Sequence, residues 1–568
     1  MTLGTALNIG RSGLLASQTA LTVTGNNLAN LATRGYHKQQ VSLSPVGDRQ
    51  FQSGMFLGQG AMIDAITRRV DSALEGRLRD AISQESRSSI RQDLLSQIEA
   101  IENEFTEIDL SSRLASYFNA WSQLGNNPQD LSLRTLVTEE AASLSNYLVD
   151  VRTSFTDLQV QTDAALGNAV DAANDLLARI ETLNDQIVAA EGGAAGEAMG
   201  LRDQRELLLQ DLAQYVDIST VEQPSGSVDV FVGSLPIVLN GKSRGLDIRN
   251  QTIDGQQITE VVIAEDQSKI DLSSGELGGY IAFRNEDLGG ALDTLDTFAN
   301  QLIFQTNRLH SQGQALRGFD SVTGTTRISD PTLALNDPAL ELDFDPQHGS
   351  FQVHLTQKST GQRVTSTINV DLDGINPASD TTLNSLVADL DAVANLSATV
   401  NGDGTVTLSA DSADFEISFS EDSSGMLAAL GVNSFFRGAD ATDIDVNPIV
   451  RDPNFVAAAQ GHLPGDNRTA LAIAGLRETA ISDLDGLSLT QYWDRHVEDY
   501  AIRLAQTRAA VDADTVVKEA LQTQQQSMSG VNADEETIDL IQFQRAFQAN
   551  ARFINVVDEM IQTLLSLA

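Results

Sequence analysis

Leucines recur every seven residues in the segment 7–30, LNIGRSGLLASQTALTVTGNNLAN. This repeat is the strongest indication of the fold. The leucines are Leu7, Leu14, Leu21 and Leu28. This spacing places apolar side chains on one stripe of a helix, as in helices that supercoil around a partner. We therefore expect a helix that runs to about Ala32 and packs against another helix.

A second apolar seam lies at the other end of the chain, within LIQFQRAFQANARFINVVDEMIQTL at 540–564. Its members are Leu540, Phe543, Phe547, Asn550, Ile554, Val557, Ile561 and Leu564. Asn550 is polar at a seam position, where it either sets register or oligomeric state or turns outward. Asn532 precedes the seam and has Glu535 three residues after it, so it is a good N-cap for this last helix.

The two seams are complementary in size. Small residues interleave the leucines of the first seam, namely Gly10, Ser17 and Thr24. They leave room for bulky side chains of a partner helix. We expect Leu14 and Leu21 to meet Phe547 and Ile554, either within one chain or between neighbouring subunits. The residues of both seams form the predicted assembly interface.

Charge is distributed unevenly along the chain. The 568 residues carry a net charge of -42, yet residues 1–47 contain no Asp or Glu. Nucleic acid and anionic membrane surfaces would repel such a chain, so neither is expected as a partner. The N-terminal helix lacks the ion pairs of a solvated helix, which indicates that neighbours cover most of its surface.

The uncharged stretch 12–33 is long enough to span a bilayer. We expect no membrane span, because Gln18, Asn26, Asn27 and Asn30 are costly in hydrocarbon. A cleavable signal peptide is not expected either, since no compact apolar run follows a basic start. Cysteine is absent, which excludes disulfides, thiolate metal ligands and cysteine nucleophiles.

Between the two ends, the pattern predicts a multidomain α+β fold. The N- and C-terminal segments form a long, coiled-coil-like helical bundle, and β-rich domains are inserted. The predicted domains are 1–47 with 527–568 as a terminal coiled-coil core, 48–216, 273–327 and 451–526 as a helical rod, 217–272 as a small antiparallel β insertion, and 328–450 as an outer β-rich domain with one helix.

Several elements can be predicted more closely. The stretch between Pro128 and Pro224 contains no proline, which favours the longest helix of the chain after Pro128. Helical spacing is also read in Ile66, Val70, Leu74 and Leu78, then in Leu94, Ile98, Ile101 and Phe105. Hairpin turns are predicted at Asn240-Gly241 and Asp254-Gly255. A break is expected at 527–531, before the last helix.

Signals for catalysis and metal binding are weak. The six histidines are scattered without metal-ligand spacing, and we expect them at the surface or partly buried. Asp371-Leu372-Asp373-Gly374 resembles the start of a calcium loop, but the remaining ligands and the closing Glu are missing. No catalytic residue, cofactor or metal is therefore predicted, and the protein is not expected to be an enzyme.

Both ends resemble a known family. Residues 12–17, 26–30 and 33–36, followed by 58–60 and 68–71, resemble the N-terminal signature of flagellar axial proteins, which are the rod, hook and hook-associated proteins. Residues 529–536 and 542–551 resemble the C-terminal signature of the hook-associated members, and 201–205 and 307–310 resemble their helical domain. Residues 364–431 resemble a module inserted in hook-associated proteins and flagellins.

The resemblance implies a structural component of the bacterial flagellum that joins the hook to the filament as a ring. It implies export through the flagellar secretion channel, an extracellular place at the hook–filament junction, and a core tube built from the terminal helices. The implied partners are further copies of the chain, the hook protein, the second hook–filament junction protein, and an export chaperone on the C-terminal helix.

A seam without its partner exposes apolar surface to water. We therefore expect the ends of the free subunit to be poorly ordered and to fold as subunits assemble. Two alternatives stay open. One is a different flagellar axial protein, such as the second junction protein or a hook subunit. The other is a secreted protein with an active outer domain at 328–450.

Overall fold

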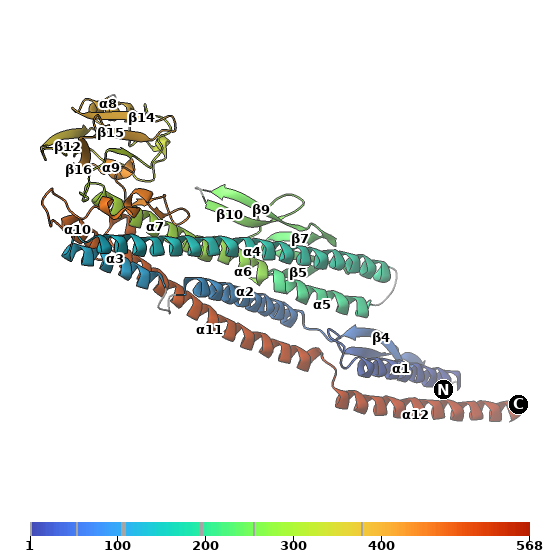
Figure 1. Ribbon diagram of the computed structural model, residues 1–568. Coiled ribbons are helices and arrows are strands. Elements are labelled where there is room, and N and C mark those ends of the chain that lie inside the picture. Colours follow the sequence, from blue (N-terminus) through green and yellow to red (C-terminus); the bar gives the residue numbers. More distant parts are fainter. Residues whose placement is uncertain are drawn as a thin grey trace. The chain divides into compact units, whose positions relative to one another are not determined.

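The structure, a computed structural model, describes residues 3–52, 55–103, 109–192, 197–253, 256–375 and 379–567 (Figure 1). Contacts divide the chain into two compact units. Unit 1 comprises Met1–Leu94, Thr162–Glu286 and Ala505–Ala568, and unit 2 comprises Leu95–Gln161 and Asp287–Leu504. The long helices α2 (Ser72–Glu102), α4 (Leu131–Glu191) and α11 (Leu489–Ser529) begin in one unit and end in the other. The multidomain α+β class is confirmed, and the four predicted domains stay a prediction.

Unit 1 contains both chain ends. Its remaining helices are α1 (Leu3–Ala29), α5 (Met199–Tyr215), α6 (Gly275–Ala282) and α12 (Ala533–Leu567), and a π-helical turn, η1 (Phe283–Leu288), follows α6. Its strands are β1 (Gln39–Pro45), β2 (Arg49–Gln52), β3 (Met55–Leu57), β4 (Ala61–Arg68), β5 (Ser219–Glu222), β6 (Val228–Val232), β7 (Leu235–Leu239), β8 (Lys242–Ser243), β9 (Leu246–Ile253) and β10 (Gln256–Ile263). The predicted first helix is therefore confirmed and ends three residues earlier than Ala32.

The prediction of the longest helix is confirmed. Helix α4 has 61 residues and begins shortly after Pro128. Its apolar stripe is buried, including Leu144, Leu148 and Phe155. Because no proline interrupts the ladder of backbone hydrogen bonds, one helix can continue over this length.

The prediction of a helix at Ile66 is wrong. Residues 61–68 form strand β4, which pairs antiparallel with β1, so that Val41 faces Ile66. The helix α2 begins only at Ser72 and contains Leu74 and Leu78. A short apolar run rich in β-branched residues fits either period, and pairing with a distant strand decides between them. The predicted helical position Phe105 lies outside the described residues.

Residues 217–272 contain antiparallel strands, while their standing as a separate insertion stays a prediction. Strands β5 to β8 form a four-stranded antiparallel sheet, and β9 pairs with β10. Asn240 (φ 52°) and Gly241 (φ 77°) turn the chain between β7 and β8, as a two-residue hairpin with left-handed residues requires. The other predicted turn, at 254–255, lies outside the described residues. The core of unit 1 joins these sheets to α4 and α5, through residues such as Leu177, Leu212 and Val230.

Unit 2 contains the outer β-rich block. Its further elements are α3 (Leu110–Asn126), α7 (Gly289–His310), β11 (Ser321–Thr323), η2 (Pro338–Leu340), β12 (Gly349–Gln357), β13 (Arg363–Val370), α8 (Leu383–Asp391), β14 (Leu396–Val400), β15 (Val406–Ala410), β16 (Phe415–Ser420), α9 (Met426–Ala429), β17 (Phe436–Arg437), β18 (Asp445–Val446), η3 (Pro448–Arg451), η4 (Pro453–Phe455), α10 (Arg468–Gly475) and η5 (Ser482–Leu484).

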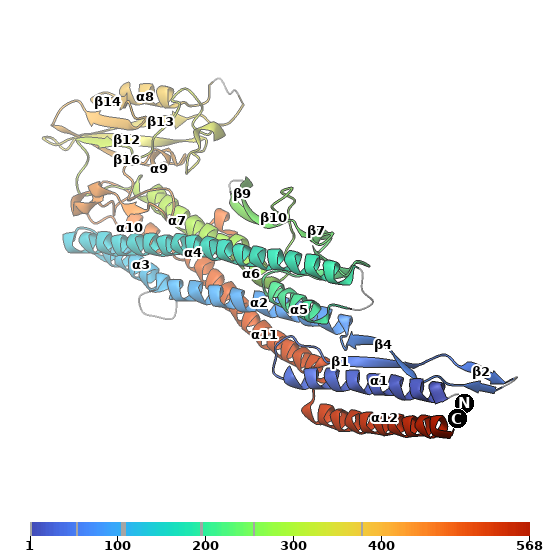
Figure 2. The same cartoon turned by 90° about the vertical axis from the view of Figure 1, so that its right-hand side faces the viewer.

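The outer block is built from two three-stranded antiparallel sheets, ordered β13-β12-β16 and β11-β15-β14 (Figure 2). Inward residues of β12 and β16, such as Phe351, Val353 and Phe419, join Leu386 of α8 in one apolar cluster. Helix α8 lies between β13 and β14 in the chain, and β14 and β15 form a hairpin. The block therefore has an apolar cluster of its own.

Three histidines, His37, His310 and His354, contradict the expectation of surface or partly buried positions. His310 is fully buried beside Trp121 and Phe435. Its Nδ1 lies 2.8 Å from the carbonyl of Asn433, and the amide of Ala457 donates to its Nε2. Burial lowers the pKa of His310 to about 4, so this ring is a neutral structural group. His354 lies in β12 between the hydroxyls of Thr365 and Ser420, and His37 belongs to the site described next.

Candidate functional site

The two chain ends meet in unit 1. Helices α1 and α12 lie side by side (Figures 1 and 2), and their contact is the most extensive between any two helices in the described chain. A Cβ placed on Gly10 would lie 2.8 Å from Cγ1 of Ile554, and one on Gly13 would lie 2.9 Å from the amide of Asn550. The glycines therefore let the two helix backbones approach closely.

The buried face of α1 is not its leucine stripe. The buried residues of this helix are small or polar, namely Gly10, Ala16, Ser17, Ala20, Val23, Thr24 and Asn27. Leu7, Leu14 and Leu21 are half-buried, and Leu28 is 37% exposed. The small residues between the leucines are therefore the most buried part of α1, and the expected meeting of Leu14 and Leu21 with Phe547 and Ile554 stays a prediction. Close packing of two backbones favours small side chains at the centre of the contact.

Most of the C-terminal seam faces α1. Val557 is buried, while Leu540, Phe543, Phe547, Asn550, Ile554 and Ile561 are half-buried. The amide of Asn550 donates toward Oγ of Ser17 over 3.5 Å, so this residue turns inward rather than outward. Leu564 is 53% exposed and lies past the covered part of the seam.

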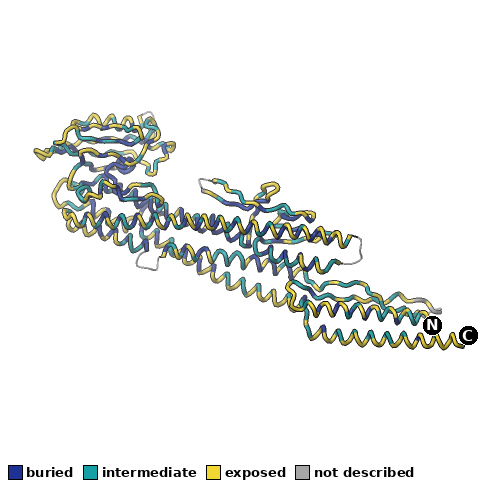
Figure 3. The backbone as a smooth tube through the Cα atoms, turned by 45° about the vertical axis from the view of Figure 1, so that its right-hand side comes forward, coloured by how far each residue is buried: buried dark blue, intermediate teal, exposed yellow. Residues whose placement is uncertain are grey.

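Helix α12 also carries an exposed apolar stripe outside the predicted seam. Its members are Ile538, Ile541, Phe553, Val556 and Met560, each at least 43% exposed. Figure 3 shows most of this helix as exposed. The sequence contains apolar residues on both faces of α12. Only the pairing with α1 shows which of these faces remains exposed to solvent.

Three consecutive residues tie the helix pair to the rest of unit 1, and we call 36–38 the contact triplet. The hydroxyl of Tyr36 donates to Oδ1 of Asn27 at 2.8 Å. Nδ1 of His37 lies 2.8 Å from a carboxylate oxygen of Asp203 on α5. The ammonium group of Lys38 lies 2.8 Å from the carboxylate of Glu536 on α12. Each residue of the triplet thus holds a different helix.

Further charged groups complete this polar cluster. Arg68 at the end of β4 donates to Asp203 at 2.9 Å. Glu75 of α2 faces Nε2 of His37 at 3.6 Å and accepts hydrogen bonds from Gln210 and Gln525. Buried ions are stabilised only when opposite charges and hydrogen bonds satisfy them. The cluster balances three cations with three carboxylates, while Nε of Arg68 is buried without a hydrogen-bond partner.

The protonation of the triplet follows from these partners. Burial lowers the pKa of His37, but the hydrogen bonds to Asp203 and Glu75 outweigh it and raise that pKa to about 9. Burial likewise lowers the pKa of Lys38, and the contact with Glu536 raises it overall. Burial raises the pKa of Tyr36 to about 12. At neutral pH, both His37 and Lys38 are therefore cations.

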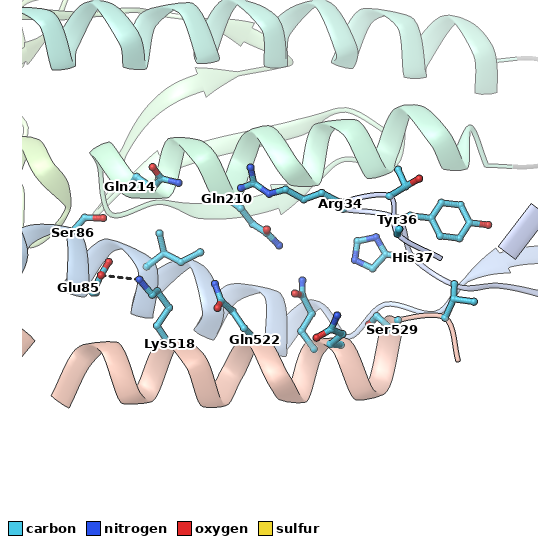
Figure 4. A pocket seen from close by; sticks show the side chains of 18 of the residues that line it. Arg34, Tyr36, His37, Glu85, Ser86, Gln210, Gln214, Lys518, Gln522 and Ser529 are labelled. Carbon is cyan, nitrogen blue, oxygen red and sulfur yellow. Dashed lines mark ion pairs between the residues drawn. The ribbon is translucent and has the colours of Figure 1, made fainter. Parts of the chain in front are cut away.

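A cleft of about 800 Å³ opens beside the triplet (Figure 4). Its lining comes from the loop after α1 and from α2, α5 and α11, and an ion pair joins Glu85 to Lys518 at 2.7 Å. Amides and hydroxyls dominate the lining, with Gln210, Gln214 and Gln522 turned toward the opening.

One group of side chains outside this site has metal-ligand types. His348, Asp371 and Asp373 place ligand atoms within 4.8 Å of one another. The sequence spacing did not reveal this neighbourhood. His348 and Asp373 are exposed, and Nδ1 of His348 already accepts from the amide of Leu372. Exposed acidic groups of this kind occur without metals, and we assign no site here.

None of the described helices has a stretch apolar enough for its length to cross a bilayer.

Comparisons with known proteins agree with this architecture. Residues 95–326 match the family described as "Flagellar hook-associated protein FlgK helical domain". Residues 7–37 match "Flagella basal body rod protein", and 522–567 match "Flagellar basal body rod FlgEFG protein C-terminal". The two rod families thus cover the paired chain ends. The chain belongs to the flagellar axial proteins, a class of structural components of the bacterial flagellum that assemble with one another.

Within this class, the chain is a member of the flagellar hook-associated protein 1 family. It is 23% identical to "Flagellar hook-associated protein 1" of Escherichia coli (strain K12), over 99% of each chain. It is 28% identical to the protein of the same name from Bacillus subtilis (strain 168), over 56% of this chain and 71% of that one. A solved structure of the flagellar hook junction protein FlgK from Burkholderia pseudomallei aligns with a TM-score of 0.49 at 17% identity, over 80% of this chain and all of that one.

Proposed function

We propose that the chain forms a ring between the hook and the filament, and that the α1–α12 pair is the element through which its copies assemble. The exposed apolar stripe of α12 carries this proposal. After α12 has paired with α1, Phe553, Val556 and Met560 are still 43%, 54% and 52% exposed. An apolar stripe of this size on a soluble subunit favours a further helix as its cover.

Assembly would supply that cover. Each fully buried Val, Met or Phe contributes about 1.5–3 kcal/mol, so a stripe of several residues can drive association. The N-terminal region carries no acidic residue before Asp48, which lowers repulsion where copies of an otherwise acidic chain meet. The twelve residues of the two predicted seams are part of the proposed assembly interface. The exposed stripe of α12 adds further residues to this interface.

The family points to further partners. They are the hook protein, the second hook–filament junction protein, and an export chaperone on the C-terminal helix. The proposed location is extracellular, at the hook–filament junction, after export without a cleavable signal peptide. We propose a structural and non-enzymatic role, which the match to structural flagellar proteins supports.

Charge placed on the open face of α12 tests the assembly proposal. Val556→Asp with Met560→Asp should abolish filament attachment in cells that lack the native protein, because two charges would be buried between subunits. Gln548→Asp is the matched control, since it adds a charge at an exposed polar position of the same helix. Swimming motility and electron microscopy of filaments provide the measurement.

Two further variants extend the test to both ends. Deletion of 533–568 should leave cells without attached filaments. The double substitution Leu14→Asp with Leu21→Asp should have the same effect. Attached filaments of normal length in the deletion strain would refute assembly through the terminal helices.

A further inference from the structure

Lys38 contacts two helices, at the end of α11 and at the start of α12. Its backbone amide donates to the carbonyl of Ser529, the last residue of α11, at 2.8 Å. Its ammonium group contacts Glu536 at 2.8 Å and Glu535 at 3.3 Å, in the first turn of α12. One N-terminal residue therefore spans the break between the last two helices.

The carboxylate of Glu536 depends on these contacts. Glu536 is 1% exposed. The carboxylate oxygen that does not contact Lys38 accepts a hydrogen bond from Nδ2 of Asn27 at 3.1 Å. Asn27 is itself buried and held in place, because its Oδ1 accepts from Tyr36 and from the amide of Gln39. Loss of Lys38 would leave a buried charge without a counterion, which is far more costly than loss of an exposed ion pair.

Burial changes along α12. Glu536 in its first turn is covered, whereas Leu564 and Leu565 near its end are 53% and 72% exposed. Polar contacts therefore hold the α1–α12 pair together at the start of α12. At the end of α12, apolar side chains are exposed to solvent.

We propose that Lys38, Asn27 and Glu536 form a latch that keeps the first turns of α12 ordered in the single subunit, before any neighbour binds. The latch restricts the expected disorder of the chain ends to the far part of the helix pair. Coverage of the exposed end of α12 by neighbouring copies rests on the proposed function. The latch itself does not depend on that function. The latch sets the direction of α12 as it leaves the break at 530–532.

Hydrogen exchange of the soluble full-length chain, followed by mass spectrometry, tests the latch. Peptides covering 533–540 should be protected in the native sequence, while those covering 558–566 should exchange fast. Lys38→Met keeps the aliphatic stem and removes the charge. It should reduce protection of 533–540 by on the order of 100-fold, as expected when a buried ion loses its partner.

A double variant separates charge from packing. Lys38→Met with Glu536→Gln removes both charges and should restore most of the protection, because a neutral amide can still bond to Asn27. Lys242→Met is the control, since Lys242 pairs with Glu181 and Asp185 at an exposed position in the same unit. This control should leave the exchange of 533–540 unchanged.

Three results would overturn the latch. They are equal exchange of 533–540 and 558–566 in the native chain, no effect of Lys38→Met, and a double variant as unprotected as the single one. Failure of the assembly proposal has a different signature. In that case, Val556→Asp with Met560→Asp would leave attached filaments, whatever the exchange experiment shows.

Discussion

Asn27 and Glu536 are 509 positions apart in the chain, and the amide of Asn27 donates a 3.1 Å hydrogen bond to the Glu536 carboxylate. Both side chains are buried. This bond joins the N-terminal helix to the first turn of the C-terminal one, next to the contact triplet. The chain ends therefore belong to one packed structure, which is unusual because termini tend to be the least constrained part of a domain.

Enlargement of Gly10 should weaken the helix pair. Gly10→Leu places carbon atoms where Ile554 and Phe553 already lie, and overpacking of this kind costs about 1–3 kcal/mol. Gly4→Leu is the matched control, because nothing lies within 4 Å of a Cβ at Gly4 in the same helix. Exchange of α12 amides should accelerate only in the Gly10 variant. Equal exchange in the two variants would contradict the close approach of the helices.

The contact triplet should be sensitive to alkaline pH. His37 has a folded pKa of about 9, above its ordinary value of 6.5, so protonation stabilises the folded cluster. This contribution is complete below pH 6.5, declines above it, and is lost as pH rises through 9.

Glu75 sets the acid limit of the same cluster. Burial raises its pKa, but hydrogen bonds from His37 and Gln525 lower it overall, so its contribution is present above 4.5 and is lost toward acid. Exchange protection around 36–38 should therefore be greatest between pH 4.5 and 6.5, after correction for intrinsic rates. His37→Gln should flatten the alkaline limb. A native profile without that limb would refute a charged His37.

Removal of the cap of α12 should fray its start. Oδ1 of Asn532 accepts from the amides of Asp534 and Glu535, which confirms the predicted N-cap. Asn532→Ala should cost about 1 kcal/mol, seen as faster exchange confined to the first turn. Asn555→Ala, at an exposed mid-helix position, serves as control and should leave that turn protected.

The outer β block should respond to core mutations on its own. Phe419 is fully buried in the apolar cluster of this block, and Phe419→Ala should destabilise it by about 3–5 kcal/mol. Val364→Ala, at a position 51% exposed on β13, should have little effect. Exchange should accelerate in β12 and β16 while the α1–α12 peptides keep their rates. Acceleration at the chain ends would contradict a separate core.

Local patterns predicted much of the fold. The absence of proline after Pro128 indicated α4, Asn240-Gly241 indicated the turn between β7 and β8, and Asn532 indicated the start of α12. Each depends on neighbours in sequence, where helical or strand periodicity and capping act directly. The failure at Ile66 shows the limit of such patterns. That residue lies in a strand because β1 pairs with it, and a short apolar run does not reveal its partner.

Side-chain periodicity is a local property, so the sequence alone predicted two terminal helices, each with an apolar seam. Which faces of these helices meet depends on tertiary packing. Gly10 and Gly13 allow two backbones to approach, so the small residues of α1 are covered while Leu28 stays partly exposed. Pairing also leaves Val556 and Met560 exposed and brings Lys38 into contact with Glu536. Contacts between residues so far apart arise from packing in three dimensions, which no local pattern encodes.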